Sequence, residues 1–455
     1  MIKTFINAWK VKDIRSKMLY TLLLIVVYRL GSFIPVPSVD TTKLEAIMES
    51  ATQYDFLNFL DLFSGGSLSQ FSLFAMGISP YITASIIMQL LAIAIPALER
   101  LSKEEDGQKK IEKITRIVGV VLALVQSISI VVGLQSISNG QSLLKEITLF
   151  GTSGFGKFMN GFAPYLVTGI CCTAGTAFLM WMGERITEKG IGNGVSMLIF
   201  ASIVSSVPAV VKDIIVGTFR LGIPSTGDLA YSWWYSIAVI VIVLIMVVGI
   251  VMVEKAVRRI PVQYAKRVVG RKLYGGQSTH IPLKANANGV MPLIFAMTIL
   301  QVPAMISQFW PNSGFYKFVS TYLSASSNNP VGLVVYYVIY ALLIVGFAYF
   351  YSSITFNPVE ISKNLQQNGG FITGIRPGRP TSDYLQRKSS RLTMFGAIFL
   401  MLVAIVPTVL LKVLDIKVLR AFGPTSILIM ISVSLEVADQ LDSLMLARTY
   451  KGFLN

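Results

Sequence analysis

Few side chains in this sequence could take part in catalysis or bind a metal. The 455-residue chain contains one histidine, His280, and two cysteines, Cys171 and Cys172, which are adjacent within an apolar stretch. A zinc site or a His-based catalytic triad needs a richer set of ligands or partners. We therefore expect no catalytic residues, no metal and no cofactor, and we interpret the cysteines as small residues that pack between helices.

Ionisable side chains are also scarce where they would drive ion-coupled transport. Transporters of that kind carry charged residues deep in their spans. Here Arg29 lies near the outer end of the first apolar run, where it can reach the interface, and Glu436 and Asp439 lie near the inner end of the last. This pattern weakens the hypothesis of an inverted-repeat secondary transporter, which we keep as the alternative function.

The amino-acid composition is that of an integral membrane protein, so we expect the protein to function in a membrane. Hydrophobic residues make up 53% of the chain and charged residues only 14%, whereas soluble domains carry about 25% charged residues. Ten apolar runs are long enough to cross roughly 30 Å of hydrocarbon. They lie near residues 18–34, 74–95, 117–135, 162–182, 192–211, 233–253, 290–309, 331–351, 392–411 and 422–438.

Basic residues indicate how these spans are oriented. Most of the 39 Lys and Arg residues fall in alternate loops, which predicts that segments 1–17 and 439–455 both lie in the cytoplasm. Two cytoplasmic basic loops, 254–289 and 357–391, are longer than orientation alone requires. The first alternates on both sides of Gly270-Arg271 and predicts a hairpin. Such loops suit docking of an acidic partner or RNA, although contact with anionic lipid is the simpler reading for basic loops in general.

One hydrophobic stretch is broken. Residues 55–63 form an amphipathic piece too short to cross a bilayer, and Ser64-Gly65-Gly66-Ser67 separates it from the next full span. Interrupted helices at membrane depth tend to lie along substrate paths. Two aliphatic pairs with helical spacing, Ile78 with Ile82 and Val195 with Ile199, could line such a path. Periodicity alone cannot distinguish them from ordinary bundle packing.

Six long strings of this sequence resemble the SecY family, whose members are the central subunits of the bacterial protein-conducting channel. These strings are RLGSFIPVPSVD (29–40), LFSGGSLSQFSLFAMGISPYITASIIMQLL (62–91), MWMGERITEKGIGNGVSMLIFA (180–201), YAKRVVGRKLYGGQSTHIPLKANANGVMPLIFA (264–296), FNPVEISKNLQQNGGFITGIRPGRPT (356–381) and GPTSILIMISV (423–433). The resemblance covers essentially the whole chain in collinear order.

The resemblance implies an all-α membrane protein with ten transmembrane helices around a central pore. The helices would form two pseudo-twofold-related halves, 18–211 and 212–438, with a plug helix at 55–68. Spans two, three, seven and eight would form a lateral gate. The implied pore ring is Ile78, Ile82, Val195, Ile199, Ile294 and Ile429. The implied plug and hinge residues are Asn58, Phe59, Leu62, Phe63, Ser64, Gly65 and Gly66.

The resemblance also implies a function and partners. The protein would translocate unfolded secretory polypeptides across the bacterial plasma membrane and release transmembrane segments into lipid. It would bind the small subunits SecE and SecG, signal sequences, nascent polypeptides and membrane lipids. The motor ATPase SecA or the ribosome would supply the driving force, since the chain has no Walker motif. The implied docking residues are Arg267, Arg271, Lys272, Arg376 and Arg379.

Overall fold

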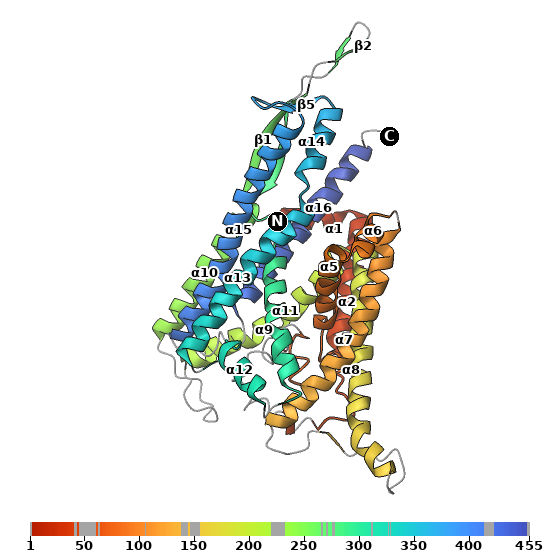
Figure 1. Cartoon of the computed structure of the whole chain (residues 1–455), viewed down its shortest axis with the longest axis vertical. Helices are drawn as coiled ribbons and strands as arrows, with labels where there is room; N and C mark the ends of the chain where they lie inside the picture. The colour runs from red at the N-terminus through yellow and green to blue at the C-terminus, as the bar shows by residue number, and fades with distance from the viewer. Residues whose placement is uncertain are drawn as a thin grey trace.

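Helices build most of the chain in the computed structural model (Figure 1). The structure describes residues 2–40, 43–44, 61, 64–104, 106–137, 144–145, 155–219, 233–264, 267–269, 272–274, 278–310, 313–325, 327, 329–413 and 423–452. Within these residues, a helix overlaps each of the ten predicted spans. These helices are α2 (Lys12–Gly31), α5 (Ser79–Ala94), α7 (Gly107–Ile137), α8 (Phe155–Lys189), α9 (Gly194–Phe219), α10 (Trp233–Lys255), α11 (Met291–Ser307), α13 (Pro330–Thr355), α15 (Arg379–Val413) and α16 (Pro424–Gly452).

Shorter elements lie at the two ends of the helical bundle. The short helices are α1 (Ile2–Lys10), α6 (Pro96–Lys103), α12 (Gly314–Tyr322) and α14 (Pro358–Gln367). The strands are β1 (Val257–Tyr264), β2 (Arg267–Val269), β3 (Lys272–Tyr274), β4 (Ser278–Lys284) and β5 (Gly370–Ile372). All five strands come from the two long basic loops, so the sheet structure belongs to the surface expected to face the cytoplasm.

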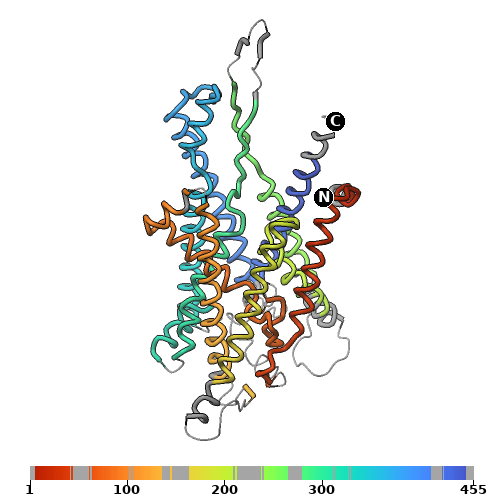
Figure 2. Tube along the Cα trace, turned by 90° about the vertical axis from the view of Figure 1, so that its right-hand side faces the viewer, coloured from red at the N-terminus to blue at the C-terminus, as the bar shows by residue number. Residues whose placement is uncertain are grey.

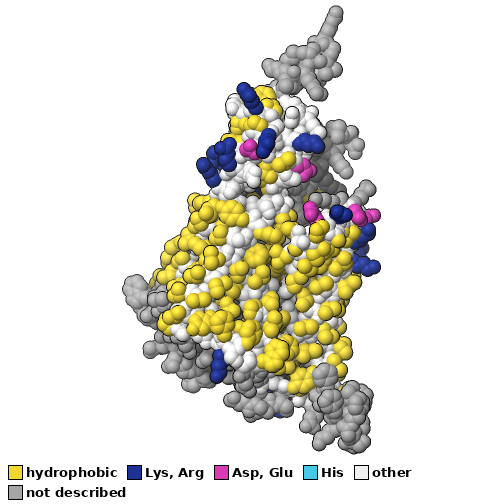
Figure 3. Space-filling model, in the orientation of Figure 1, with side chains coloured by type: hydrophobic (Ala, Val, Ile, Leu, Met, Phe, Trp, Pro, Cys, Tyr) yellow, Lys and Arg dark blue, Asp and Glu magenta, His cyan; other side chains and the backbone are white. Residues whose placement is uncertain are grey.

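The outer surface of the bundle is apolar. Within the described residues, four helical stretches are long and apolar enough to cross a membrane: Gly107–Gln135, Ala163–Lys189, Pro330–Gln367 and Arg379–Leu410. Side chains such as Leu244 on α10 and Leu342 on α13 are 61% and 67% exposed. Figure 3 shows apolar side chains over the bundle and Lys and Arg gathered toward the end that carries the sheet. Lipid is the solvent that matches this surface.

The helices pack as two groups that meet along two seams. In the first group, α7 packs against α5 and α8, and α8 packs against α2 and α9. In the second, α11, α13, α15 and α16 pack in sequence order, and α10 packs against α16. One seam is formed by α9 with α10 and α16, and the other by α11 with α5 and α7.

The sheet projects from one end of the bundle (Figure 2). Antiparallel β1 and β4 pair from Val257↔Lys284 to Gln263↔Ser278. Strand β5, from the second basic loop, adds to the other edge of β1 through Val262↔Ile372. Further along the first loop, β2 and β3 flank Gly270 and Arg271, which lie outside the described residues. The predicted hairpin is thus confirmed, and the pairing between the two loops is a feature that the sequence did not predict.

An apolar cluster stabilises this projection. Ile260 and Val262 of β1 and Ile372 of β5 are buried with Leu365 of α14 and Leu385 of α15. Alternation along β1 turns these apolar residues inward and leaves Arg259 and Gln263 exposed. The cluster therefore joins the two basic loops into one folded unit.

The two ends of the chain lie at the same end of the bundle as the sheet. Ala8 of α1 and Ile14 at the start of α2 are buried against Leu441 of α16. Ile191, in the turn between α8 and α9, belongs to the same cluster. Helix α1 therefore joins the first group of helices to the last helix of the second.

Candidate functional site

The six residues predicted for the pore ring come from four helices and all belong to one large apolar cluster of the bundle, which contains many other residues. Four members are buried and two are half-buried against them. The buried members are Ile78, Ile199, Ile294 and Ile429, and the half-buried members are Ile82 and Val195.

The six positions lie at or near the starts of their helices. Ile78 is the N-cap of α5, and the other ring positions lie within the first two turns of α5, α9, α11 and α16. Proline occupies the first turn of α5 and of α11, where its missing N–H breaks no hydrogen bond.

The segment after the broken half-span is packed between α2 and α9. Ser64 and Ser67 are 0% and 1% exposed, and Gly65 and Gly66 have positive φ angles of 68° and 81°. Such angles favour glycine, which explains the two adjacent glycines. The predicted plug and hinge residues Asn58, Phe59, Leu62 and Phe63 lie outside the described residues.

This packing differs from the loose tether that the glycines suggest. The Tyr28 hydroxyl donates to the Ser64 carbonyl at 2.9 Å. Arg29 Nη1 donates to the Gly65 carbonyl at 2.7 Å. The guanidinium of Arg29 therefore makes a structural contact with this segment.

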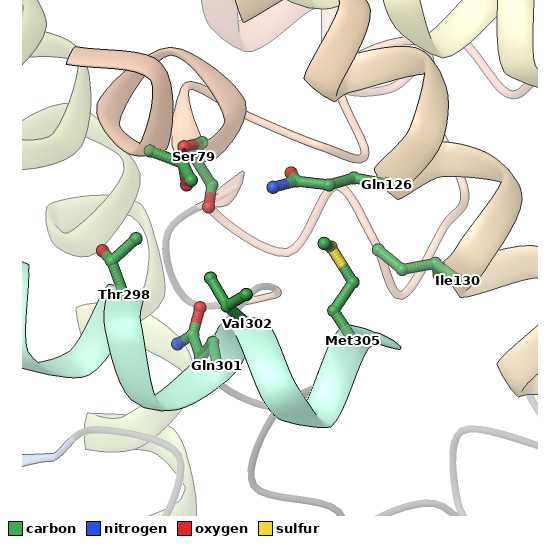
Figure 4. A pocket seen from close by; sticks show the side chains of 8 residues that line it. Ser79, Gln126, Ile130, Thr298, Gln301, Val302 and Met305 are labelled. Atoms are coloured by element: carbon green, nitrogen blue, oxygen red, sulfur yellow. Dashed lines mark hydrogen bonds between the residues drawn. The ribbon is translucent and has the colours of Figure 1, made fainter. Parts of the chain in front are cut away.

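A polar pocket lies in the seam between α11 and the pair α5 and α7 (Figure 4). It is lined by Ser79, Thr83, Gln126, Ile130, Thr298, Gln301, Val302 and Met305. The hydroxyls of Thr83 and Thr298 donate to carbonyls of their own helices at 3.0 and 2.8 Å. The amides of Gln126 and Gln301 are then the strongest polar groups on the pocket wall.

Sequence reasoning missed this pocket, although a signal was present. Amide side chains are uncommon in apolar spans and mark helix contacts or functional cavities. Ser129 of α7 also donates to the Met305 carbonyl of α11 at 2.9 Å, beside the pocket. The seam therefore includes polar contacts beside the apolar cluster that α5 and α11 share.

The acidic residues at the inner ends of the last spans make structural contacts. Glu254, at the end of α10, accepts from Asn286 Nδ2 at 2.9 Å and from Ser432 Oγ at 3.1 Å. Lys284 and Asp439 form an exposed pair at 3.6 Å. Glu436 is exposed. These contacts fix the base of the sheet to α10 and α16.

The second basic loop presents its arginines from a braced turn. Gly374 and Gly378 have φ angles of 82° and 95° and bound the turn. The Gly378 carbonyl accepts from Ser362 Oγ at 2.6 Å, and the Arg376 carbonyl accepts from Thr381 Oγ1 at 2.8 Å. The side chains of Arg376 and Arg379 are exposed. A fixed backbone therefore holds two cations toward the solvent.

Arg267 and Lys272 belong to the paired strands β2 and β3, and Arg271 lies outside the described residues. His280 is exposed on β4, Cys172 is buried and Cys171 is half-buried. Within the part of the chain that the structure describes, no group of three His, Cys, Asp or Glu residues could hold a metal ion.

The amino-acid sequence is similar to proteins of known role along its whole length. A family model for SecY matches residues 72–438. The protein translocase subunit SecY of Streptomyces galbus is 43% identical over 463 residues, with 100% of both chains covered. The subunit of the same name from Bacillus subtilis (strain 168) is 39% identical over 457 residues, again with 100% of both chains covered.

The fold is similar to solved channel structures. "The structure of a protein conducting channel" matches with a TM-score of 0.62 at 20% identity. A structure of SecY concerned with how its plug domain maintains a membrane seal matches at 0.61 and 20%. Sec61 in a canine ribosome-channel complex matches at 0.58 and 18%. In each case 94% of this chain and 91% of the other are covered, and at these identities the likeness concerns the fold alone.

Proposed function

Because the chain belongs to the SecY family, we propose that it forms a channel that translocates unfolded secretory polypeptides across the bacterial plasma membrane. The apolar cluster of six aliphatic side chains from four helices carries this proposal. Side chains without fixed polar partners can surround many different sequences without binding any of them tightly. When such a constriction is narrow, it also excludes water and ions by dewetting.

The two helix groups correspond in this proposal to the halves 18–211 and 212–438. Their seam at α5, α7 and α11 is the lateral gate, together with α13, and releases apolar segments into lipid. The small pocket between Gln126 of α7 and Gln301 of α11 lies in this seam and supports the assignment, because the packing between the two helix groups is incomplete there. Both chain termini and the sheet face the cytoplasm, as the distribution of basic residues indicates.

The segment 55–68 acts as the plug that closes the outer side of the pore. Its described part is joined to the apolar cluster that contains the ring residues, since Tyr28 belongs to that cluster and donates to the Ser64 carbonyl. The plug would fill the outer side of the pore and so keep the channel closed when no polypeptide occupies it.

The two joined basic loops form the docking surface for SecA or the ribosome. Arg376 and Arg379 are exposed on a braced turn, and the paired strands β2 and β3 carry Arg267 and Lys272. A rigid basic surface of this kind attracts acidic protein or RNA. SecE and SecG complete the membrane complex, and signal sequences and nascent polypeptides enter it from the cytoplasmic side.

Reconstituted translocation tests the proposed function directly. The full chain is placed in liposomes with SecE and SecG, and SecA, ATP and a radiolabelled secretory precursor are added. We expect the precursor to become protected from external protease only when ATP is present. A well-folded complex that binds SecA but protects no precursor would overturn the proposal.

A further inference from the structure

The plug segment is fastened to α2 through two backbone carbonyls. Ser64 O accepts from the Tyr28 hydroxyl at 2.9 Å, and Gly65 O accepts from Arg29 Nη1 at 2.7 Å. Adjacent residues of one helix therefore bind adjacent carbonyls of the segment. A buried carbonyl that loses its donor is left unsatisfied, so each contact favours the bound position.

Three constraints fix the direction of the Tyr28 hydroxyl. The ring is 2% exposed and stacks on Phe74, with 5.9 Å between centroids. The hydroxyl also lies 2.7 Å from Ser202 Oγ of α9. Because a carbonyl can only accept, the Tyr28 proton points to Ser64 O, and Ser202 donates either to Tyr28 or to Leu198 O, 2.9 Å away. The Tyr28 hydroxyl is therefore oriented to donate its proton to the Ser64 carbonyl.

The backbone at Gly65 fits closely against α9. A Cβ added to Gly65 would lie 3.0 Å from Ser205 Oγ and 3.1 Å from Ser202 Cα. Gly66 has a similar positive φ, but its added Cβ would meet nothing within 4 Å. Only the first glycine is therefore required by the contact with α9.

Several other polar groups of the segment form hydrogen bonds within it. The Asp61 carboxylate accepts from Ser69 N at 2.8 Å and from Ser69 Oγ at 2.5 Å. The Asp61 carbonyl accepts from Gly66 N at 2.9 Å and from Ser64 Oγ at 3.0 Å. This loop keeps its own shape. Leu68 is buried in an apolar cluster with residues of α7, and the carbonyls of Ser64 and Gly65 make the hydrogen bonds to α2.

We propose that Tyr28 and Arg29 of α2, with Ser202 of α9, form a clasp that retains the plug through the carbonyls of Ser64 and Gly65. The inference rests on the proposed function of residues 55–68 as the plug. It adds that opening requires loss of these contacts, in which α2 supplies the two shorter donors and Ser205 of α9 lies 3.5 Å from the Gly65 carbonyl. Tyr28 and Arg29 are positioning residues for the closed state.

Accessibility of Ser67 reports whether the clasp is closed. Ser67 is 1% exposed and its hydroxyl has no hydrogen-bond partner among the described residues, so Ser67→Cys preserves local packing. The variant is made with Cys171→Ala and Cys172→Ala, because these are the chain's cysteines. The full chain is reconstituted in liposomes with SecE and SecG, and a membrane-impermeant maleimide is added from the plug side.

We expect Tyr28→Phe to raise the labelling rate about tenfold, the effect of losing one ordinary hydrogen bond. Arg29→Gln is expected to raise it at least as much, and Arg29→Lys to restore part of the protection because a cation remains. The matched control is Tyr20→Phe, which removes a hydroxyl from the same helix away from the segment and should leave the rate unchanged.

The two glycines provide a second, independent test. Gly65→Ala and Gly66→Ala both place an L residue at positive φ and share that backbone strain. Only Gly65→Ala adds a tight contact with α9, 3.0 Å from Ser205 Oγ and 3.1 Å from Ser202 Cα, so it should raise the labelling rate above that of Gly66→Ala. Equal rates for the two variants would contradict the clasp.

Translocation by the wild-type complex separates the two hypotheses. If the wild type fails to translocate a precursor, the channel proposal falls, and the labelling rates still decide whether Tyr28 and Arg29 retain the segment. If the wild type translocates but Tyr28→Phe and Arg29→Gln label no faster than Tyr20→Phe, the clasp is overturned and the channel proposal stands.

Discussion

Glu254 accepts a hydrogen bond from Asn286 Nδ2 at 2.9 Å, which joins the end of α10 to the turn between β4 and α11. The same carboxylate accepts from Ser432 of α16 at 3.1 Å. One acidic side chain therefore connects three elements at the base of the cytoplasmic sheet. Asn286 also donates to the Gly289 carbonyl, so its amide is fixed from both sides.

Replacing Glu254 should destabilise this junction. Glu254→Leu removes the acceptor from two donors, at a cost of about 1–3 kcal/mol for groups left unpaired. Glu254→Gln keeps one acceptor oxygen and should cost less. Thermal unfolding of the purified complex in detergent measures both, with the exposed Glu188→Gln as the control. An unchanged midpoint for Glu254→Leu would contradict a structural role for this contact.

A polar side chain in the apolar cluster should open a path for ions. Ile294 of α11 is 5% exposed and belongs to the same apolar cluster as the other members of the proposed ring. We expect Ile294→Asn to raise the resting ion conductance of planar bilayers several-fold, because an amide hydrates a constriction that aliphatic groups keep dry. Ile294→Val, which only shortens the side chain, should stay close to wild type. Equal conductance for the two variants would contradict the ring assignment.

Removal of the plug segment should also raise the resting conductance. Deletion of residues 58–67 removes both the proposed stopper and the carbonyls bound by Tyr28 and Arg29. We expect channels that open frequently without any polypeptide, measured by single-channel recording. If the deleted protein folds and stays as tightly closed as wild type, the plug assignment is wrong.

Charge reversal on the braced turn should weaken docking. Arg376→Glu replaces an exposed cation without changing the glycines and hydrogen bonds that shape the turn. We expect binding of SecA or ribosomes to nanodisc-embedded complex to weaken about tenfold, with the loss reduced at high salt. The control is Lys317→Glu, an equal charge change on α12. Equal weakening by both variants would indicate a general charge effect.

Helix α8 packs closely against the segment that leads into α5, and this packing should make Gly175 necessary for stability. A Cβ on Gly175 would lie 1.9 Å from the Leu73 carbonyl, whereas one on Gly346 would meet nothing within 4 Å. We expect Gly175→Ala to lower stability by about 1–3 kcal/mol through overpacking. Gly346→Ala should be neutral or stabilising, since alanine favours the helix. Thermal unfolding in detergent compares the midpoints of the two variants, and similar midpoints would contradict the packing argument.

The membrane architecture was predictable because its signals are local. Each apolar run has the length that a bilayer requires, and a helix overlaps each one. The hairpin around Gly270-Arg271 followed from strand alternation over a few residues. Hydropathy and alternation are properties of short windows, so a single sequence suffices to detect them.

Contacts between distant segments were not predictable in the same way. Pairing of Val262 with Ile372 joins two loops that lie far apart in the chain. The two glycines at 65 and 66 suggested a loose connection, because a glycine pair does not reveal which helix lies beside it. Tyr28 and Arg29 provide that neighbour, and only the three-dimensional structure brings them to the segment.

The strand pairing of β1 with both β4 and β5 has a mechanical consequence. Strand β1 continues from α10, β4 leads into α11, and β5 lies between α13 and α15. Force applied to either basic loop is therefore shared by four membrane helices, because the backbone hydrogen bonds of the sheet act in parallel. A motor that pushed on this sheet would act on a single stiff unit, and its stroke would reach four helices of the same half of the bundle, the half formed by residues 212–438.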